Sequence, residues 1–323
     1  MTIDFVRHRF WFYAISLILI IPGVISLLLP GGLRPGIDFT SGTIMTLRFQ
    51  QDVDQPSLRE AFAGLGHGEA IIQRSDEGTF VVRTLPFEGT LPEAATDASQ
   101  TERQVIVDRL TERFGPVEVL SLDVVSPIIA SEIVRYAALA VVAACAGILL
   151  YLWWAFRRVP NPIRYGACAV AALVHDALLV LGVFSILGRF SAVELDAMFI
   201  TAVLTVIGFS VHDTIVVFDR IRENRARHAG EPFAEVVNHS ILQTFARSIM
   251  TSFTVVLTLL SLYLFGGSAI RNFVLALLIG IISGTYSSIF NAAPILVVWQ
   301  EWDDRRRGRA ASTRAPRTRR AIS

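Results

Sequence analysis

Two aspartates in this sequence stand inside apolar stretches that contain no other charge. Asp176 and Asp213 lie in such runs of 24 and 22 residues, and each directly follows a histidine, His175 or His212. An ionised carboxylate at the centre of a membrane costs roughly 3 kcal/mol on insertion scales. Such a residue persists only with a partner, a path for water or a chemical task. The task open to a lone carboxylate is to take up and release a proton.

A cation that could pair with Asp213, Arg247, occurs at the beginning of a later apolar stretch. Asp213 lies seven residues before Arg220, which places it roughly 10 Å from that end of its helix. Arg247 is expected at a similar depth on a helix that runs in the opposite direction. A structural ion pair would need only matched charges, whereas a proton-coupling role would need Asp213 to titrate. We favour the proton-coupling role and keep a structural ion pair or a polar contact in helix packing as its alternatives.

The two histidines are weaker candidates for proton coupling than Asp213 and Arg247. For His175 with Asp176, a proton relay and ordinary packing remain equally open. His212 is adjacent to Asp213 in the chain, so the two side chains point about 100° apart around a helix. We therefore expect His212 to be a polar neighbour of Asp213 rather than a ligand.

Membrane helices must position these residues. Hydrophobic residues make up 53% of the 323, charged residues only 18%, and the mean hydropathy is +0.53. These values exclude a disordered chain, a nucleic-acid-binding protein and an ordinary soluble enzyme, and they indicate several membrane spans of about 20 residues each. The expected fold class is a polytopic α-helical membrane protein with six transmembrane helices. They are expected at residues 10–29, 135–156, 165–187, 198–219, 246–265 and 272–298.

Arginine placement predicts the orientation of the chain. Clusters of arginine in alternate loops and at both ends put residues 1–9, the loop 220–245 and the Arg-rich tail 299–323 in the cytoplasm, by the positive-inside rule. Residues 30–134 then face outward. They hold 16 acidic residues and 8 arginines, a net charge of −8. An acidic outer domain is therefore expected between the first and second spans.

The pattern of this outer domain predicts a small α+β fold. Strands are expected at 42–49, 70–73, 79–83 and 117–125, because these segments alternate or are rich in β-formers. Helices are expected at 57–65 and about 100–114, and a loop at 86–99. The order strand, helix, strand, strand, helix, strand is that of the split, ferredoxin-like arrangement.

No pattern in the outer domain indicates a cofactor or a metal. It contains no metal-ligand cluster of His, Cys and Asp, no phosphate-binding glycine loop and no nucleophile elbow, so a binding or mechanical role is expected. In the last span, Gly280, Gly284 and Ser288 recur at every fourth residue. Such a stripe of small residues predicts close helix packing.

Four stretches resemble motifs of SecF members of the SecD/SecF family of protein-export membrane subunits. The most specific is residues 208–224, GFSVHDTIVVFDRIREN, which is similar to the family's fourth-span motif. Residues 36–43, 264–267 and 278–290 (GIDFTSGT, LFGG and LIGIISGTYSSIF) are similar to further family motifs. The resemblance extends over about residues 10–300. It departs at His212, where many members have asparagine.

The resemblance implies a proton-driven machine of the resistance-nodulation-division type. It assigns the proton-carrying aspartate to Asp213 and the essential arginine to Arg247, with a less defined role for Asp176. It implies a non-enzymatic subunit in the cytoplasmic (inner) membrane that uses the proton-motive force to help translocating polypeptides finish crossing. The partners that it implies are a SecD-like subunit, the SecYEG channel, the translocating polypeptide, and YajC and YidC. No cofactor and no nucleic acid is implied.

Two rival functions remain from the residues themselves. A proton-coupled exporter of small molecules or lipids would need a substrate pocket in the outer domain and a twelve-span chain. An intramembrane hydrolase would need two carboxylates close enough to share a proton, and the two His-Asp pairs lie on neighbouring spans. The sequence contains neither a Gly-x-Gly-Asp motif nor a His-Glu-x-x-His motif, which argues against the hydrolase.

The arginine distribution makes the orientation testable. In a background without Cys145 and Cys168, a single cysteine at position 60 or 112 should react with a membrane-impermeant maleimide added to intact cells. Labelling only after permeabilisation would show that residues 30–134 lie in the cytoplasm.

Overall fold

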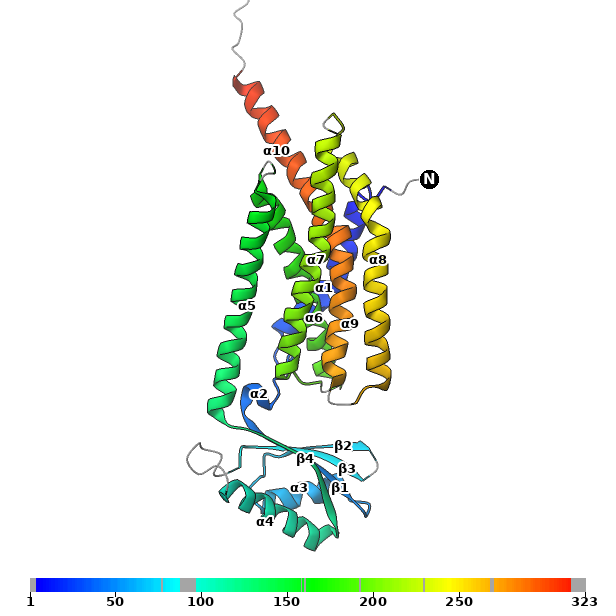
Figure 1. The fold of residues 1–323 in the computed structure, drawn as a ribbon. Coiled ribbons are helices and arrows are strands. Elements are labelled where there is room, and N and C mark those ends of the chain that lie inside the picture. The colour runs from blue at the N-terminus through cyan, green and yellow to red at the C-terminus, as the bar shows by residue number, and fades with distance from the viewer. Residues whose placement is uncertain are drawn as a thin grey trace, which may run out of the picture. The chain divides into compact units, whose positions relative to one another are not determined.

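Long helices and one small sheet make up the fold, which a computed structural model describes for residues 4–76, 78–87, 97–157, 159, 161–191, 193–228, 230–267 and 270–314 (Figure 1). The chain divides into two compact units. A helical unit contains Met1–Leu33, Val141–Val193 and Met198–Ser323, and an α+β unit contains Arg34–Ala140 with Glu194–Ala197.

Six helical segments among the described residues are long and apolar enough to cross a membrane. They correspond to the six predicted spans, and the predicted fold class is confirmed. The segments are α1 (Arg9–Leu28), α5 (Pro127–Phe156), α6 (Pro162–Ser191), α7 (Ala197–Arg227), α8 (Phe233–Phe265), and α9 (Arg271–Ser287) with its continuation.

Several helices extend beyond the apolar runs from which they were predicted. Helix α8 begins at Phe233 and α7 continues to Arg227, because a charged side chain ends a hydrophobic run without ending a helix. The last span is not one regular helix. After α9, a π-helical turn, η2 (Ser288–Ala292), leads into α10 (Ala293–Arg314). Hydropathy does not distinguish a π turn from an α turn, so this change of helix type could not be predicted.

Helices α1 and α6 pack so closely that their backbones are in contact at Gly23 and Gly182. A methyl group on Gly182 would lie 2.7 Å from the Cα of Gly23, and the reverse holds for Gly23. Ser26 and Ser185 hydrogen-bond each other at 2.7 Å. Arg189, in the last turn of α6, donates to the Ser26 carbonyl and, 2.7 Å away, to the Leu29 carbonyl. Arg189 thereby satisfies carbonyls that the end of α1 leaves without helical partners.

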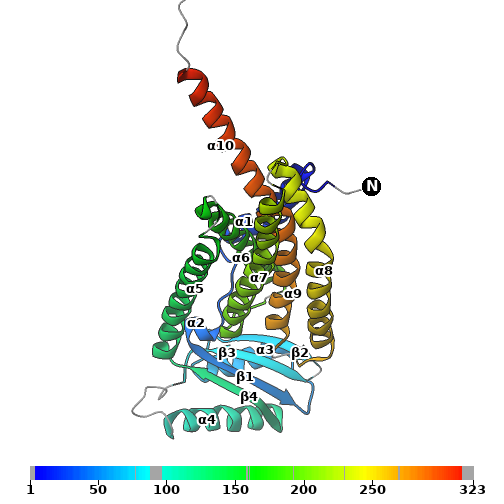
Figure 2. The same cartoon turned by 45° about the horizontal axis from the view of Figure 1, so that its top comes forward.

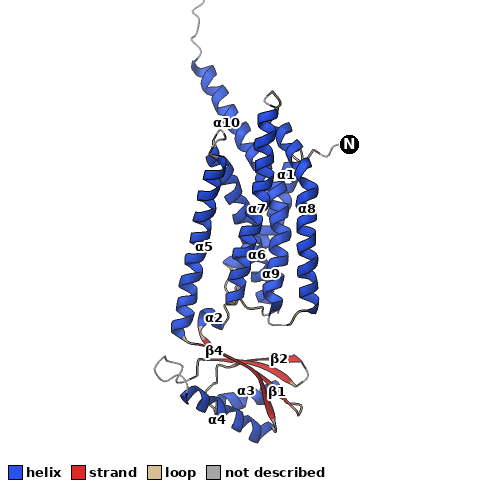
Figure 3. Ribbon diagram, viewed as in Figure 1, coloured by secondary structure: helices blue, strands red, loops and turns tan. Residues whose placement is uncertain are grey.

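The α+β unit has the predicted element order: β1 (Gly42–Phe49), α3 (Gln55–Gly64), β2 (Ile71–Asp76), β3 (Thr79–Thr84), α4 (Asp97–Phe114) and β4 (Val117–Val125). The antiparallel sheet has strand order β2-β3-β1-β4, seen side by side in Figure 2 and as red arrows in Figure 3. A short helix that was not predicted, α2 (Ile37–Thr40), precedes β1. Most of the predicted 86–99 loop lies outside the described residues.

The core of the α+β unit follows from the alternation in β1. Met45, Leu47 and Phe49 are all buried, whereas the residues between them are at least partly exposed. Leu58 of α3 and Leu110 of α4 are fully buried in the same cluster. A sheet with one covered face produces this period of two.

The close packing of α1 and α6 is testable by adding single methyl groups. Gly182→Ala should destabilise the helical unit by about 1–3 kcal/mol, because the backbone of Gly23 cannot move aside without strain. Gly166→Ala, in the same helix but with nothing within 4 Å of the added carbon, should be neutral or stabilising by up to about 1 kcal/mol. Reversible unfolding in mixed micelles measures both, and equal stability of the two variants would contradict the packing argument.

Candidate functional site

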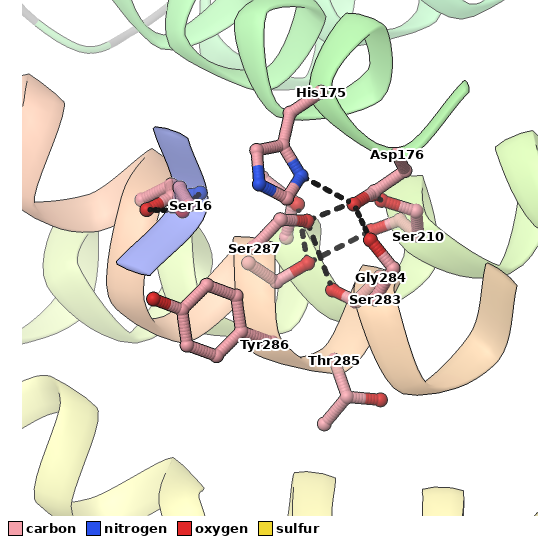
Figure 4. A network of polar contacts seen from close by, with 12 residues as sticks. Ser16, His175, Asp176, Ser210, Ser283, Gly284, Thr285, Tyr286 and Ser287 are labelled. Carbon is pink, nitrogen blue, oxygen red and sulfur yellow. Dashed lines mark hydrogen bonds and ion pairs between the residues drawn. The ribbon is translucent and has the colours of Figure 1, made fainter. Parts of the chain in front are cut away.

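A carboxylate surrounded by hydroxyl groups lies in the interior of the helical unit (Figure 4). Asp176, near the middle of α6, is completely buried. Its Oδ1 atom accepts a hydrogen bond from Ser283 at 2.7 Å and contacts His175 Nδ1 at 3.0 Å. Its Oδ2 atom accepts from Ser210 at 2.6 Å and from Ser287 at 2.7 Å.

These four contacts match the four acceptor positions of an ionised carboxylate. The contact with His175 suits the tautomer whose proton is on Nδ1. His175 Nε2 is buried and has no hydrogen-bond partner among the described residues. In that tautomer Nε2 carries a lone pair, so the site has one ring nitrogen without a hydrogen-bond partner among the described residues.

Helix α9 supplies two of the hydroxyls because of its spacing. Ser283 and Ser287 are four residues apart, so they lie on one face of the helix. Between them, Gly284 packs against α7: a methyl group there would lie 3.0 Å from Ser210 Cβ. Larger residues at position 284 would hold α9 away from α7. The glycine thus allows Ser210 and the two α9 serines to reach the same carboxylate.

The small-residue stripe predicted in the last span lies along this contact between α9 and α7. A methyl group on Gly280 would overlap the side chain of Val206. Ser288 donates to the Ser210 carbonyl at 3.2 Å and hydrogen-bonds the Thr214 hydroxyl at 2.8 Å. The contacts repeat every four residues on both helices, so a regular seam joins them.

Asp213 has a different environment from Asp176. It lies on α7 with only 4% of its surface exposed, yet its Oδ2 atom has no hydrogen-bond partner among the described residues. The hydroxyl of Ser248, on α8, is also buried and has no hydrogen-bond partner among the described residues. Asp213 therefore keeps an acceptor open in an environment where an unmet acceptor costs free energy.

The structure does not join Asp213 to Arg247. Arg247 has an exposed side chain on α8, and no ion pair involving it is found within the described segments. Equal depth, which the sequence predicted, does not settle which way a side chain faces around its helix. His212 is also exposed, on a different side of α7 from the buried Asp213.

Comparison with known proteins places the chain in a family. The model for "Protein export membrane protein SecD/SecF, C-terminal" matches residues 106–302, and the model for the "SecD/SecF GG Motif" matches residues 31–53. The chain is 50% identical over 304 residues to the protein translocase subunit SecF of Thermobaculum terrenum, covering 93% of this chain and 95% of that protein. The chain belongs to the SecD/SecF family.

Further relatives agree with this assignment. The SecF subunit of Anaerolinea thermophila is 41% identical, over 93% of this chain and 96% of that protein. The crystal structure of SecDF from Thermus thermophilus superimposes with a TM-score of 0.76 at 35% sequence identity. That match covers 93% of this chain but 39% of the SecDF chain. This SecF-type chain is thus a multi-pass membrane protein that corresponds to a part of the longer SecDF protein.

Sequence reasoning for this SecD/SecF member missed the serines around Asp176. The signal available was a pair of hydroxyl residues, Ser283 and Ser287, four apart in an apolar run. That spacing is common in membrane helices, where it indicates packing. Only the placement of α6, α7 and α9 shows that the hydroxyls meet one carboxylate. Within the described residues, no cluster of three or more His, Cys, Asp or Glu could hold a metal ion.

The hydroxyl cage can be tested one donor at a time. Ser283→Ala removes a hydrogen bond to a charged group and should lower the free energy of unfolding by about 1.5–3 kcal/mol. Ser261→Ala is the matched control, because that exposed hydroxyl bonds only the carbonyl of its own helix at Leu257, and should change stability by less than about 0.5 kcal/mol. If both variants unfold alike, the Ser283 hydroxyl does not stabilise Asp176.

Proposed function

We propose that this chain is a non-catalytic, proton-driven subunit that helps secreted polypeptides finish crossing the cytoplasmic (inner) membrane. Membership of the SecD/SecF family and the names of its relatives, protein translocase subunits SecF, support a role in protein translocation. The observation that carries the proton-driven part is Asp213, a buried carboxylate with one oxygen unsatisfied among the described residues.

Asp213 is the proposed carrier of the transported proton. Protonation would neutralise a carboxylate that lies at low dielectric, and this favours a different packing of α7 than the ionised form does. Arg247 is its proposed counter-charge, in a second arrangement in which α8 turns or shifts toward Asp213. Two features of the described residues support such a cycle: the Oδ2 atom of Asp213 has no hydrogen-bond partner, and the exposed guanidinium of Arg247 has no ion pair.

Asp176 and His175 form the proposed second proton-holding group. Their support is His175 Nε2, which has no hydrogen-bond partner among the described residues and belongs to a ring that contacts a carboxylate with four contacts already made. Ser287 could adjust to a proton on Asp176, because its hydroxyl lies 3.2 Å from the Gly284 carbonyl as well as 2.7 Å from the carboxylate. His212 is assigned no more than a polar contribution near Asp213.

A SecD-like subunit is the proposed partner in the membrane. The SecDF protein of Thermus thermophilus contains in one chain a region equivalent to this protein and a much longer remainder, so a separate SecD-like chain would supply that remainder here. The SecYEG channel, the translocating polypeptide, YajC and YidC are the further proposed partners. In the proposed topology both termini are cytoplasmic and the α+β domain faces outward.

The proton-carrying role is tested by Asp213→Asn, which keeps the shape of the side chain but cannot ionise. In vesicles that contain the SecD-like partner and the channel, this variant should insert normally and export at the rate of the wild type treated with an uncoupler. Arg247→Met should lose export similarly, and the double variant should remain inactive. Asp108→Asn, the same change at an exposed position of α4, is the control and should export normally.

A structural ion pair makes a different prediction for the same proteins. If charge matching alone mattered, the neutral double variant would recover export that each single variant lost. Wild-type export by Asp213→Asn, with undiminished sensitivity to the uncoupler, would refute the proton-carrier role of Asp213.

A further inference from the structure

The short connection between α6 and α7 belongs structurally to the α+β unit. Residues Glu194–Ala197 group with Arg34–Ala140 rather than with the helices that they join. Leu195 donates its backbone N–H to the Arg34 carbonyl at 2.8 Å, and its own carbonyl accepts from Gly36 N–H at 2.7 Å. These two bonds make Pro35 and Leu195 partners in a parallel bridge.

The residue types of this segment suit the bridge. A parallel bridge around position 35 uses the carbonyl of residue 34 and the N–H of residue 36, so the missing N–H of Pro35 is not needed. At position 36 only glycine fits, because a methyl group would lie 2.5 Å from the Leu195 carbonyl oxygen. Gly36 therefore permits a close approach that other residues would prevent, and Pro35 does not interrupt the bridge.

Asp38 reaches from α2 to the first residue of α7. Its Oδ2 atom accepts a hydrogen bond from Ala197 N–H at 2.7 Å, across 159 positions of sequence. The first N–H groups of a helix have no helical partner, and a carboxylate there is favoured by both hydrogen bonding and the helix dipole. The α+β unit thus supplies an N-terminal cap to the helix that carries Asp213.

A fourth contact ties the connection to the sheet itself. Arg83 of β3 forms an ion pair with Glu194, and both side chains are largely buried. Burial lowers the pKa of the Arg83 guanidinium from its ordinary value, which is so high that the group stays cationic at neutral pH. Arg83 pairs with Ile44 of β1 in the sheet register, and β3 is an inner strand of the sheet. The ion pair therefore attaches Glu194 to an inner strand.

We propose that Arg34, Gly36, Asp38 and Arg83 form a clip that fastens the beginning of α7 to the α+β domain and transmits movement of that helix to the domain. The proposal rests on the proposed function, since it gives the clip a part in proton-driven export. Ala197 and Asp213 are 16 residues apart on one continuous helix, about 24 Å. In this proposal a shift of α7 at Asp213 is carried along the helix to Ala197 and so to the clip.

The clip is tested by breaking it and then closing it covalently. Asp38→Ala removes the cap and should lower proton-dependent export by about fivefold or more, the lower end of ordinary coupling between sites. In a background without native cysteines, Pro35→Cys with Leu195→Cys should form a disulfide, because bridged strands lie about 4.8 Å apart. The disulfide should restore export to Asp38→Ala, and a reductant should remove the restored activity.

Charge reversal tests the ion pair independently. Arg83→Glu and Glu194→Arg should each lower export, and their combination should recover much of it. Gly64→Ala, in the same domain but with open space around the added carbon, is the control and should export normally. Hydrogen exchange at the first turn of α7, measured in intact membranes, should rise in Asp38→Ala and fall again when the disulfide forms.

The outcomes separate the clip from the function on which it rests. Full export by Asp38→Ala with faster exchange at α7, or lost export that a formed disulfide does not restore, would overturn the clip. The effect of an uncoupler on wild-type export is measured beside these variants and depends on no clip residue. If wild-type export does not respond to the uncoupler, the proton-driven function fails, while hydrogen exchange and disulfide formation still report whether the clip exists.

Discussion

The helical unit is organised around the need to stabilise a carboxylate that water cannot reach. Asp176 is held by three serine hydroxyls and one imidazole from α6, α7 and α9. Each of those hydrogen bonds is worth more inside a membrane protein than at a surface, because the alternative is an unsatisfied charge at low dielectric. The three helices must approach closely for the donors to converge. Small residues at the α7–α9 seam follow from that requirement.

Two aspartates on neighbouring helices are thus placed in opposite situations. Asp176 has every acceptor position engaged, and the Nε2 atom of its neighbour His175 has no partner in the part of the chain that the structure describes. Asp213 itself has an oxygen without a partner among the described residues. A fully coordinated carboxylate suits a fixed point, whereas an incompletely coordinated one suits a group that exchanges partners. This contrast is the support for the proposed roles, a proton carrier at Asp213 and a proton-holding group at Asp176 and His175.

The short segment between α6 and α7 is part of the α+β unit, because Glu194–Ala197 group with Arg34–Ala140. The 34–38 segment lies within the matched GG motif, and its Arg34, Gly36 and Asp38 each hydrogen-bond a residue of the 195–197 segment. This motif therefore makes a defined set of hydrogen bonds. The last of those bonds reaches Ala197, the first residue of α7.

The six spans, the α+β domain and the two intramembrane aspartates were all evident from the sequence, because hydropathy, alternation and isolated charges are local properties. Strand 117–125 was predicted with its observed ends for the same reason. The partners of these residues were not evident. Each step along a helix turns a side chain by about 100°, so a small uncertainty in packing changes which face meets which. Only the tertiary structure showed that Arg247 is exposed on the surface of α8. It also showed that Ser210, Ser283 and Ser287 meet at one carboxylate, and that Asp38 bonds the first residue of α7. These contacts join residues far apart in the chain, and the packing of whole helices decides them.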